Sequence, residues 1–223
     1  MTFISTLLFN FIILNSTLFY GLALNSITKI KSNSLFILFI NGSIFIAFII
    51  YLFNFFTALN IYITNSFLII SFFFGLIYLI KKKLFIFQAL ISVIISTIFT
   101  YKSGVFDDFN IYHLPYMQIL NEYKIVFGLS NLQTRFGHVA VFQNISAFNK
   151  NSLMGIDSYV IYTPLLISIC LIQAYYIFKS SKKILIFLTS FIFLIYYLIN
   201  ANRYGNLGND YPSHALFIIF VLF

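Results

Sequence analysis

The feature that most constrains this chain is a series of six long apolar segments. They cover residues 2–24, 35–52, 61–80, 84–101, 159–178 and 184–199. A helix of ~20 apolar residues can cross the hydrocarbon core of a bilayer. Only 8% of the residues are charged, whereas soluble domains carry about 25%. A further apolar segment begins at Ala215 and reaches the end of the sequence at Phe223. The sequence therefore predicts an all-α, polytopic membrane protein with six full spans and a truncated seventh.

Lysine clusters predict the orientation of these spans. They lie at residues 29–31, 81–83 and 179–183, which are the loops after the first, third and fifth spans. Short Lys-rich loops stay in the cytoplasm, so we expect these three loops to share the cytoplasmic side. The other loops, the longest being residues 102–158, then face outward with the N-terminus and carry all the carboxylates. The basic pI of about 9.5 follows from this topology, and we expect no nucleic-acid partner.

The outward loop 102–158 is too long for a simple connector and has helical signals of its own. Pro115 suits the first turn of a helix, where its missing N–H is not needed. Apolar residues then recur at helical spacing, and Gly128 is a suitable stop. We expect a helix over residues 115–127 in the membrane interface plane and a second helix over 138–148, which together form an outward helical cap. The side chains expected to face the lipid or the helix bundle are Tyr116, Leu120 and Tyr123.

The only adjacent acidic pair in the chain lies at the mouth of the fourth predicted span. Asp107 and Asp108 belong to the run 105–115, in which Tyr112 and His113 come directly before the predicted cap helix. Free N–H groups and the positive end of the helix dipole make the start of a helix a ready anion site. This pattern predicts a site in the turn before Pro115.

A site for phosphate-linked sugars needs a carboxylate, positive groups and access to lipid. The carboxylate takes a proton or holds a metal, and the positive groups stabilise a departing phosphate. Asp107 and Asp108 are the candidate catalytic residues, and Asp108 is the candidate ligand if a divalent metal is the cofactor. The candidate substrate-binding residues are Tyr112, His113, Arg135, His138, Arg203 and Asp210.

Each candidate residue also has a purely structural interpretation. Asp is a common helix N-cap, so the acidic pair could only close a turn. His113 could be an interface residue, and Arg135 could extend toward lipid headgroups without binding a substrate. Asp210 could be no more than a loop residue.

Two motifs resemble one family of membrane enzymes. The first is Asp108-x-x-x-Tyr112-His113-Leu-Pro115, and the second runs from Gly128 to Gly137 as Gly-Leu-Ser-Asn-Leu-Gln-Thr-Arg-Phe-Gly. They resemble integral-membrane glycosyltransferases of the GT-C fold, similar to dolichyl-phosphate-mannose mannosyltransferases, and above all an uncharacterised bacterial subgroup with a DxxxYHLP motif.

This resemblance implies an enzyme of the bacterial cytoplasmic membrane whose site faces outward. Such enzymes take a sugar from a polyprenyl-phosphate donor, and their first outward loop carries an acid that serves as base or metal ligand. Here Asp107 and Asp108 occupy that place. The resemblance also implies a division of the chain, with an N-terminal three-span addition over residues 1–80 and a partial GT-C-like core over 84–223. The acceptor, whether glycan, lipid or protein, stays open.

Two other functions remain as alternatives. A transporter or flippase of lipid-linked sugars would place its binding residues near the bilayer midplane, on broken helices. The predicted spans contain no ionisable residue, which favours chemistry at the surface over transport. A glycan polymerase or ligase of the outer face would share the predicted site.

Overall fold

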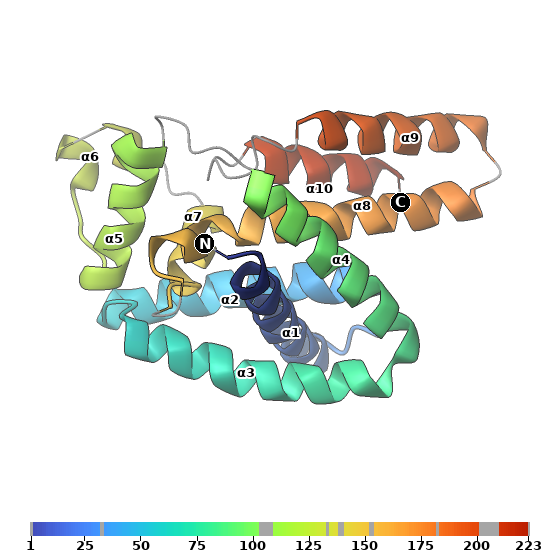
Figure 1. Ribbon diagram of the computed structural model, residues 1–223. Coiled ribbons are helices and arrows are strands. Elements are labelled where there is room, and N and C mark those ends of the chain that lie inside the picture. The colour runs from blue at the N-terminus through green and yellow to red at the C-terminus, as the bar shows by residue number, and fades with distance from the viewer. Residues whose placement is uncertain are drawn as a thin grey trace.

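The all-α prediction is confirmed by a computed structural model of the chain (Figure 1). The structure describes residues 2–31, 34–102, 109–132, 134–137, 141–151, 154–181, 183–200 and 210–222. Within these ranges the regular structure is helical, and the only β-type pairing is an isolated bridge between Asn151 and Gly155. The longer helices pack together, and the shorter ones gather at one end of the bundle.

The long helices begin within about three residues of the predicted starts, except α10, which begins at Asp210 and not at the predicted Ala215. Their bounds are α1 Phe3–Thr28, α2 Leu35–Phe56, α3 Ile61–Lys81, α4 Lys83–Lys102, α8 Tyr162–Ser180, α9 Ile184–Ile199 and α10 Asp210–Leu222. The short elements are the π-helix η1 Phe109–His113, α5 Leu114–Glu122, α6 Leu129–Leu132, η2 Thr134–Gly137, α7 Val141–Phe148 and η3 Ile156–Val160. A capping box of Thr2 and Ser5 opens α1, and Asn60 caps the start of α3.

Four helical stretches of the described chain are long and apolar enough to cross a membrane. They are Phe3–Thr28, Leu35–Phe56, Ile61–Lys81 and Asp157–Ser180. The apolar parts of α4, α9 and α10 are shorter, at Phe85–Tyr101, Ile184–Ile199 and Pro212–Leu222. The chain is thus a membrane protein by the length and composition of its helices, while six spans and a truncated seventh stay a prediction.

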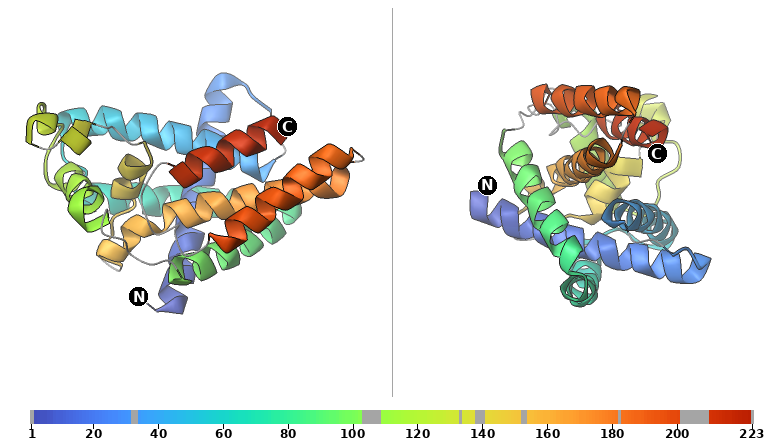
Figure 2. Two further views of the ribbon diagram at one scale, coloured as in Figure 1. Left: turned by 90° about the horizontal axis from the view of Figure 1, so that it is seen from above. Right: turned by 90° about the vertical axis from the view of Figure 1, so that its right-hand side faces the viewer.

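Helix α1 crosses α2 and α3 with the backbones in direct contact. A Cβ atom on Gly21 would overlap the carbonyl oxygen of Leu38, and one on Gly75 would overlap that of Asn15. Gly42 meets Thr17 of α1 in the same way. The right-hand view of Figure 2 shows α1 along its length, crossing the other long helices. Small residues allow such close approach between membrane helices.

Polar side chains join α1 to its neighbours inside this apolar bundle. Asn10 of α1 accepts a hydrogen bond from Ser96 (2.6 Å) and donates one to Thr97 of α4 (3.3 Å). Asn41 of α2 donates to Asn25 of α1 (2.6 Å). Hydrogen bonds between membrane helices contribute roughly 0.6–2 kcal/mol each, so α1 is fixed to α2 and α4 by side chains as well as by packing.

Helix α5 lies across the end of the bundle where α2 ends and α3 begins (Figure 1). It ends at Glu122, so the prediction that it continues to residue 127 is wrong at the C-terminal end. The reason is Asn54 of α2, whose amide donates to the carbonyl oxygens of Leu120 and Tyr123 (3.2 Å each). Tyr123 is therefore extended, with φ −127° and ψ 150°. The second cap helix is α7, Val141–Phe148, whose predicted first residues lie outside the described ranges.

Candidate functional site

His113 lies where the π-helix η1 runs directly into α5. Pro115 is the second residue of α5, in the first turn as expected. His113 already has helical dihedrals (φ −68°, ψ −51°), so the helical backbone begins no later than Phe109. The prediction of a free helix start directly before Pro115 is therefore wrong, because η1 occupies that position. Single π-turns are found frequently at functional sites.

The imidazole of His113 is buried against α7. With the amide nitrogen of Gln143 assigned toward the ring, Gln143 donates to Nδ1 of His113. The neutral ring then carries its proton on Nε2. The ring of Tyr112 lies beside that of His113, with 4.0 Å between centroids. Gln143 thus holds the orientation of the His113 ring.

A tyrosine pair next to this histidine joins the cap to α2. Asn144 of α7 donates to the hydroxyl of Tyr51 in α2 (2.7 Å). Burial raises the pKa of Tyr116 in α5 to about 12, the nearby Tyr51 adds to the rise, and a hydrogen bond with Asn144 opposes it. Tyr116 therefore stays a neutral hydroxyl at physiological pH.

Asn121 of α5 is buried at the junction of three segments. Its amide nitrogen donates to the carbonyl oxygens of Leu59 (2.7 Å) and Ala147 (2.9 Å), and its oxygen accepts from the Tyr159 hydroxyl (2.6 Å). Leu59 is in the α2–α3 turn, Ala147 in α7, and Tyr159 in η3 before α8. The Leu59 N–H also donates to the Leu120 carbonyl (3.0 Å). Asn121 therefore sets the position of the cap on the bundle.

Sequence reasoning missed these amides as positioning residues. Asn121, Gln143 and Asn144 are polar residues within cap helices that were predicted from their apolar residues. All three are buried. The available signal was a polar side chain on an otherwise apolar stretch, but the sequence does not say which segment such a side chain contacts.

The structure brings together only part of the predicted site. Tyr112 and His113 are in ring contact. Arg135 lies on η2, which approaches α5 through the rings of Phe136 and Tyr116, 6.1 Å between centroids. Asp210 is the first residue of α10, a helix that packs on α8 and α9. The predicted residues that lie outside the described ranges are Asp107, Asp108, His138 and Arg203.

The described residues contain no cluster of three or more His, Cys, Asp or Glu side chains that could hold a metal. The predicted metal ligand, Asp108, is outside these residues. The metal therefore stays a prediction.

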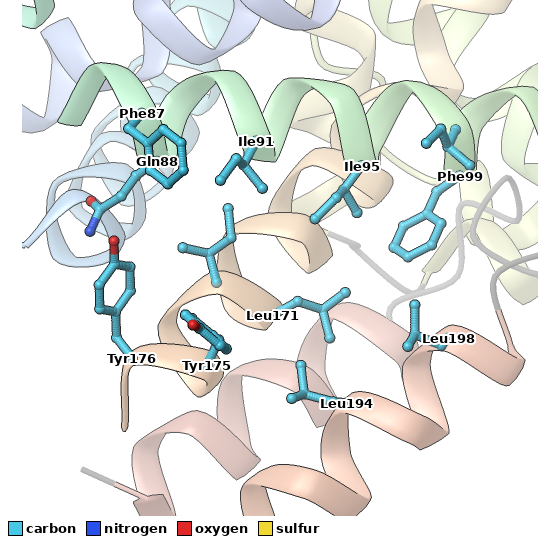
Figure 3. Close-up of a pocket in the computed structure, with 12 residues that line it drawn as sticks. Phe87, Gln88, Ile91, Ile95, Phe99, Leu171, Tyr175, Tyr176, Leu194 and Leu198 are labelled. Carbon is cyan, nitrogen blue, oxygen red and sulfur yellow. The ribbon is translucent and has the colours of Figure 1, made fainter. Parts of the chain in front are cut away.

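An apolar groove runs between α4, α8 and α9 (Figure 3). Its volume is about 540 Å³. The residues that line it are Phe87, Gln88, Ile91, Ile95, Ile98, Phe99, Leu171, Ile172, Tyr175, Tyr176, Leu194 and Leu198. Phe87 and Tyr175 are exposed at its edge, so the groove is open at the surface of the bundle.

The two ends of the groove differ in polarity. At one end, the side chains of Gln88 and Tyr176 point toward each other (Figure 3), and the buried Oε1 of Gln88 has no hydrogen-bond partner among the described residues. At the other end, Phe99 of α4 faces Leu198 of α9. Helix α4 ends just beyond Phe99, at Lys102, and the chain then enters the segment that carries the acidic pair.

Comparison with known proteins identifies the family of the chain. Residues 3–223 match a domain of unknown function, DUF8201. Neither the curated proteins nor the solved structures contain a match. Because the match covers nearly the whole sequence, from α1 to α10, the chain belongs to the DUF8201 family.

Proposed function

We propose that this protein is a glycosyltransferase that acts at the outer face of the bacterial cytoplasmic membrane, with a polyprenyl-phosphate-linked sugar as donor. The observation that carries the proposal is the groove between α4, α8 and α9. It is apolar, and α4, which lines it from Phe87 to Phe99, leads into the segment that carries Asp107 and Asp108. A lipid-linked donor needs this combination of a chain-binding surface and an adjacent polar site.

The groove suits the prenyl chain of such a donor. Its walls are almost wholly aliphatic and aromatic, and a prenyl chain has no polar atoms to satisfy. Burial of apolar surface contributes roughly 25 cal/mol per Å² where that surface leaves water. A lipid that is already in the bilayer does not leave water when it enters the groove, so its free energy of binding comes instead from packing contacts. We infer that the groove orients the donor, with its phosphate at the Phe99 end.

The chemistry belongs to the outward segment. In the proposed step, the acceptor hydroxyl oxygen attacks C1 of the donor sugar, and the bond between C1 and the phosphate oxygen breaks. The hydroxyl proton moves to the carboxylate of Asp108 or Asp107, and the phosphate leaves with the negative charge. Arg135 and Arg203 are the proposed cations for that phosphate. The Tyr112–His113 pair, held by Gln143, would line the sugar position.

A transporter of lipid-linked sugars is the second candidate. One observation favours it, because the groove follows α4 from Gln88 to Phe99 and has a polar group at the end away from the cap. A substrate that moves across a membrane needs such a continuous path. In the four long apolar helices, however, Lys81, Asp157 and Lys179 lie only at the helix ends, whereas transport sites carry ionisable side chains in the interior of a span.

The test is sugar transfer in proteoliposomes that contain a polyprenyl-phosphate sugar labelled in the sugar. Loss of a general base slows such a step by ~10²–10⁴-fold, so we expect that effect from Asp108→Asn or from Asp107→Asn. Glu122→Gln, an exposed carboxylate of α5, is the matched control and should transfer at the normal rate.

Three outcomes separate the candidates. Transfer that falls with an acidic variant but not with Glu122→Gln supports the enzyme. Wild-type transfer in Asp107→Asn, Asp108→Asn and the double variant would show that the acidic pair is only structural. Movement of the labelled lipid between leaflets, without transfer to any acceptor, would favour the transporter.

A further inference from the structure

The segment between α5 and α6, residues 123–128, exposes large aromatic side chains. A loop that faces water would bury such side chains. Tyr123 is 57% exposed and Phe127 is 80% exposed. Two further exposed rings, Phe55 and Phe56, lie in the last turn of α2. Tyr62, in the first turn of α3, is also exposed. The exposed rings therefore come from three segments that meet at one end of the bundle.

The segment is held against α2. The N–H of Ile125 donates to the carbonyl oxygen of Asn54 (2.8 Å), whose side chain in turn donates to the Tyr123 carbonyl (3.2 Å). The ring of Phe127 meets that of Phe55 edge to face, 6.3 Å between centroids. These contacts make the segment an extension of the outer surface of α2, a helix long and apolar enough to cross a membrane.

One cation lies among these rings. Lys124 is exposed and stands between Tyr123 and Ile125. Aromatic residues with a polar group are enriched at the level of the lipid headgroups, where Lys side chains meet the lipid phosphates. Phe rings belong slightly deeper, at the boundary with the acyl chains. The arrangement of Tyr123, Lys124 and the Phe rings therefore fits the boundary between lipid and water.

We propose that residues 123–128, together with Phe55, Phe56 and Tyr62, form an interfacial anchor. Its partner is the phospholipid bilayer itself, with the rings among the upper acyl chains and Lys124 on the headgroup phosphates. The continuity of this surface with the apolar faces of α2 and α3 argues for lipid over a second protein. The anchor is independent of any sugar transfer, and it holds α5 level with the membrane surface.

The chain has no Trp, so a single Trp introduced into it reports its own surroundings. Phe127→Trp in the full chain is reconstituted into phosphatidylcholine vesicles that contain lipids brominated either near the headgroup or near the chain end. We expect this Trp to lose most of its emission with the shallow bromines and less with the deep ones. Tyr123→Trp repeats the measurement from a second exposed position.

Two matched variants calibrate the depth. Phe73→Trp, on an exposed position in the middle of α3, should respond most to the deep bromines. Glu122→Trp, at an exposed position of α5, should respond to iodide in the water and little to either lipid. Vesicles with added phosphatidylglycerol should increase the shallow quenching of Phe127→Trp, and Lys124→Gln should remove that increase.

Two results would overturn the anchor. Quenching of both Phe127→Trp and Tyr123→Trp by iodide, without an effect of brominated lipid, would place the segment in water. Protection of both from iodide and from brominated lipid would mean that protein covers the rings.

Discussion

Helices of this one chain pack in two contrasting ways. Where α1 crosses α2, Gly21 and Gly42 bring the two backbones into contact. Helices α4 and α9 both pack on α8, and large side chains such as Ile91 and Ile95 line a groove of about 540 Å³ between these three helices. The contrast follows from residue size at the contact, since glycine allows the close approach that large side chains prevent. We infer that the glycine crossing provides a rigid frame and that the groove is the part available to a ligand.

The largest expected effect is at the glycine crossing. Gly42→Leu would place side-chain atoms on the backbone of α1, at the Thr17 carbonyl. Overpacking a core costs about 1–3 kcal/mol and occasionally more. We expect the upper end of that range, because a backbone carbonyl cannot move aside as a side chain can. Thermal unfolding in detergent micelles measures the loss.

Ile44→Leu is the matched control for this prediction. Ile44 lies two residues away on the exposed face of α2, so its change should alter the free energy of unfolding by no more than about 0.5 kcal/mol. Equal melting of Gly42→Leu and the wild type would mean that α1 and α2 separate easily, and the contrast between the two regions would disappear.

The second largest effect is expected at Asn121, which links the two regions. It binds Leu59, between the glycine-packed helices α2 and α3, and Tyr159, in η3 just before α8, the helix that forms one wall of the groove. Asn121→Leu leaves buried groups unsatisfied, which destabilises the cap by about 1–3 kcal/mol. Hydrogen exchange should rise in α5 and α7 while α1 stays protected.

Gln118→Leu, on a half-buried position of the same helix, is the control and should leave exchange in α7 unchanged. If Asn121→Leu instead raised exchange throughout α1, the cap and the frame would be one cooperative unit.

A smaller effect concerns pH and the contact between the cap and α2. The pKa of Tyr116 is raised from 10.0 to about 12, so folding favours its neutral form. The stability that this provides is complete below pH 10 and is lost as the pH rises toward 12. Stability of the wild type should therefore fall over this window, and Tyr116→Phe should reduce the fall. Thermal unfolding at a series of pH values compares the two, and identical curves would contradict the prediction.

The smallest effect on stability is expected inside the groove. Ile91→Trp adds bulk where space is available, so the free energy of unfolding should change by less than about 1 kcal/mol. Crosslinking to a photoactivatable polyprenyl phosphate should nevertheless fall severalfold. Phe74→Trp, on the exposed face of α3, should crosslink like the wild type. Normal crosslinking of Ile91→Trp would show that the groove does not hold the donor.

The sequence predicted the helices better than their contacts. The starts of α2, α3 and α9 fall at the predicted residues Leu35, Ile61 and Ile184, because apolar runs bounded by polar residues are local signals. The end of α5 was predicted wrongly because Asn54, far away in the sequence, donates a hydrogen bond to the carbonyl oxygen of Leu120 in the last turn of α5. No local pattern carries that information.

The candidate site shows the same division. Tyr112 and His113 could be selected from a motif, and the structure places them in contact. Gln143, which contacts His113, could not be selected from the sequence, because it reaches His113 only when α7 folds back onto α5. The glycine crossing was equally hidden, because Gly21 and Gly42 become significant only when the two helices are placed together.

The contact between α1 and α2 also limits how the protein can move. Backbones in such close contact resist sliding, because a shift along the crossing would bring residues that have a Cβ atom against the Leu38 and Thr17 carbonyls. We therefore expect α1, α2 and α3 to move as one rigid body. Widening of the groove around a long lipid would then depend on displacement of α9 relative to α4, a hinge motion that leaves the frame at rest.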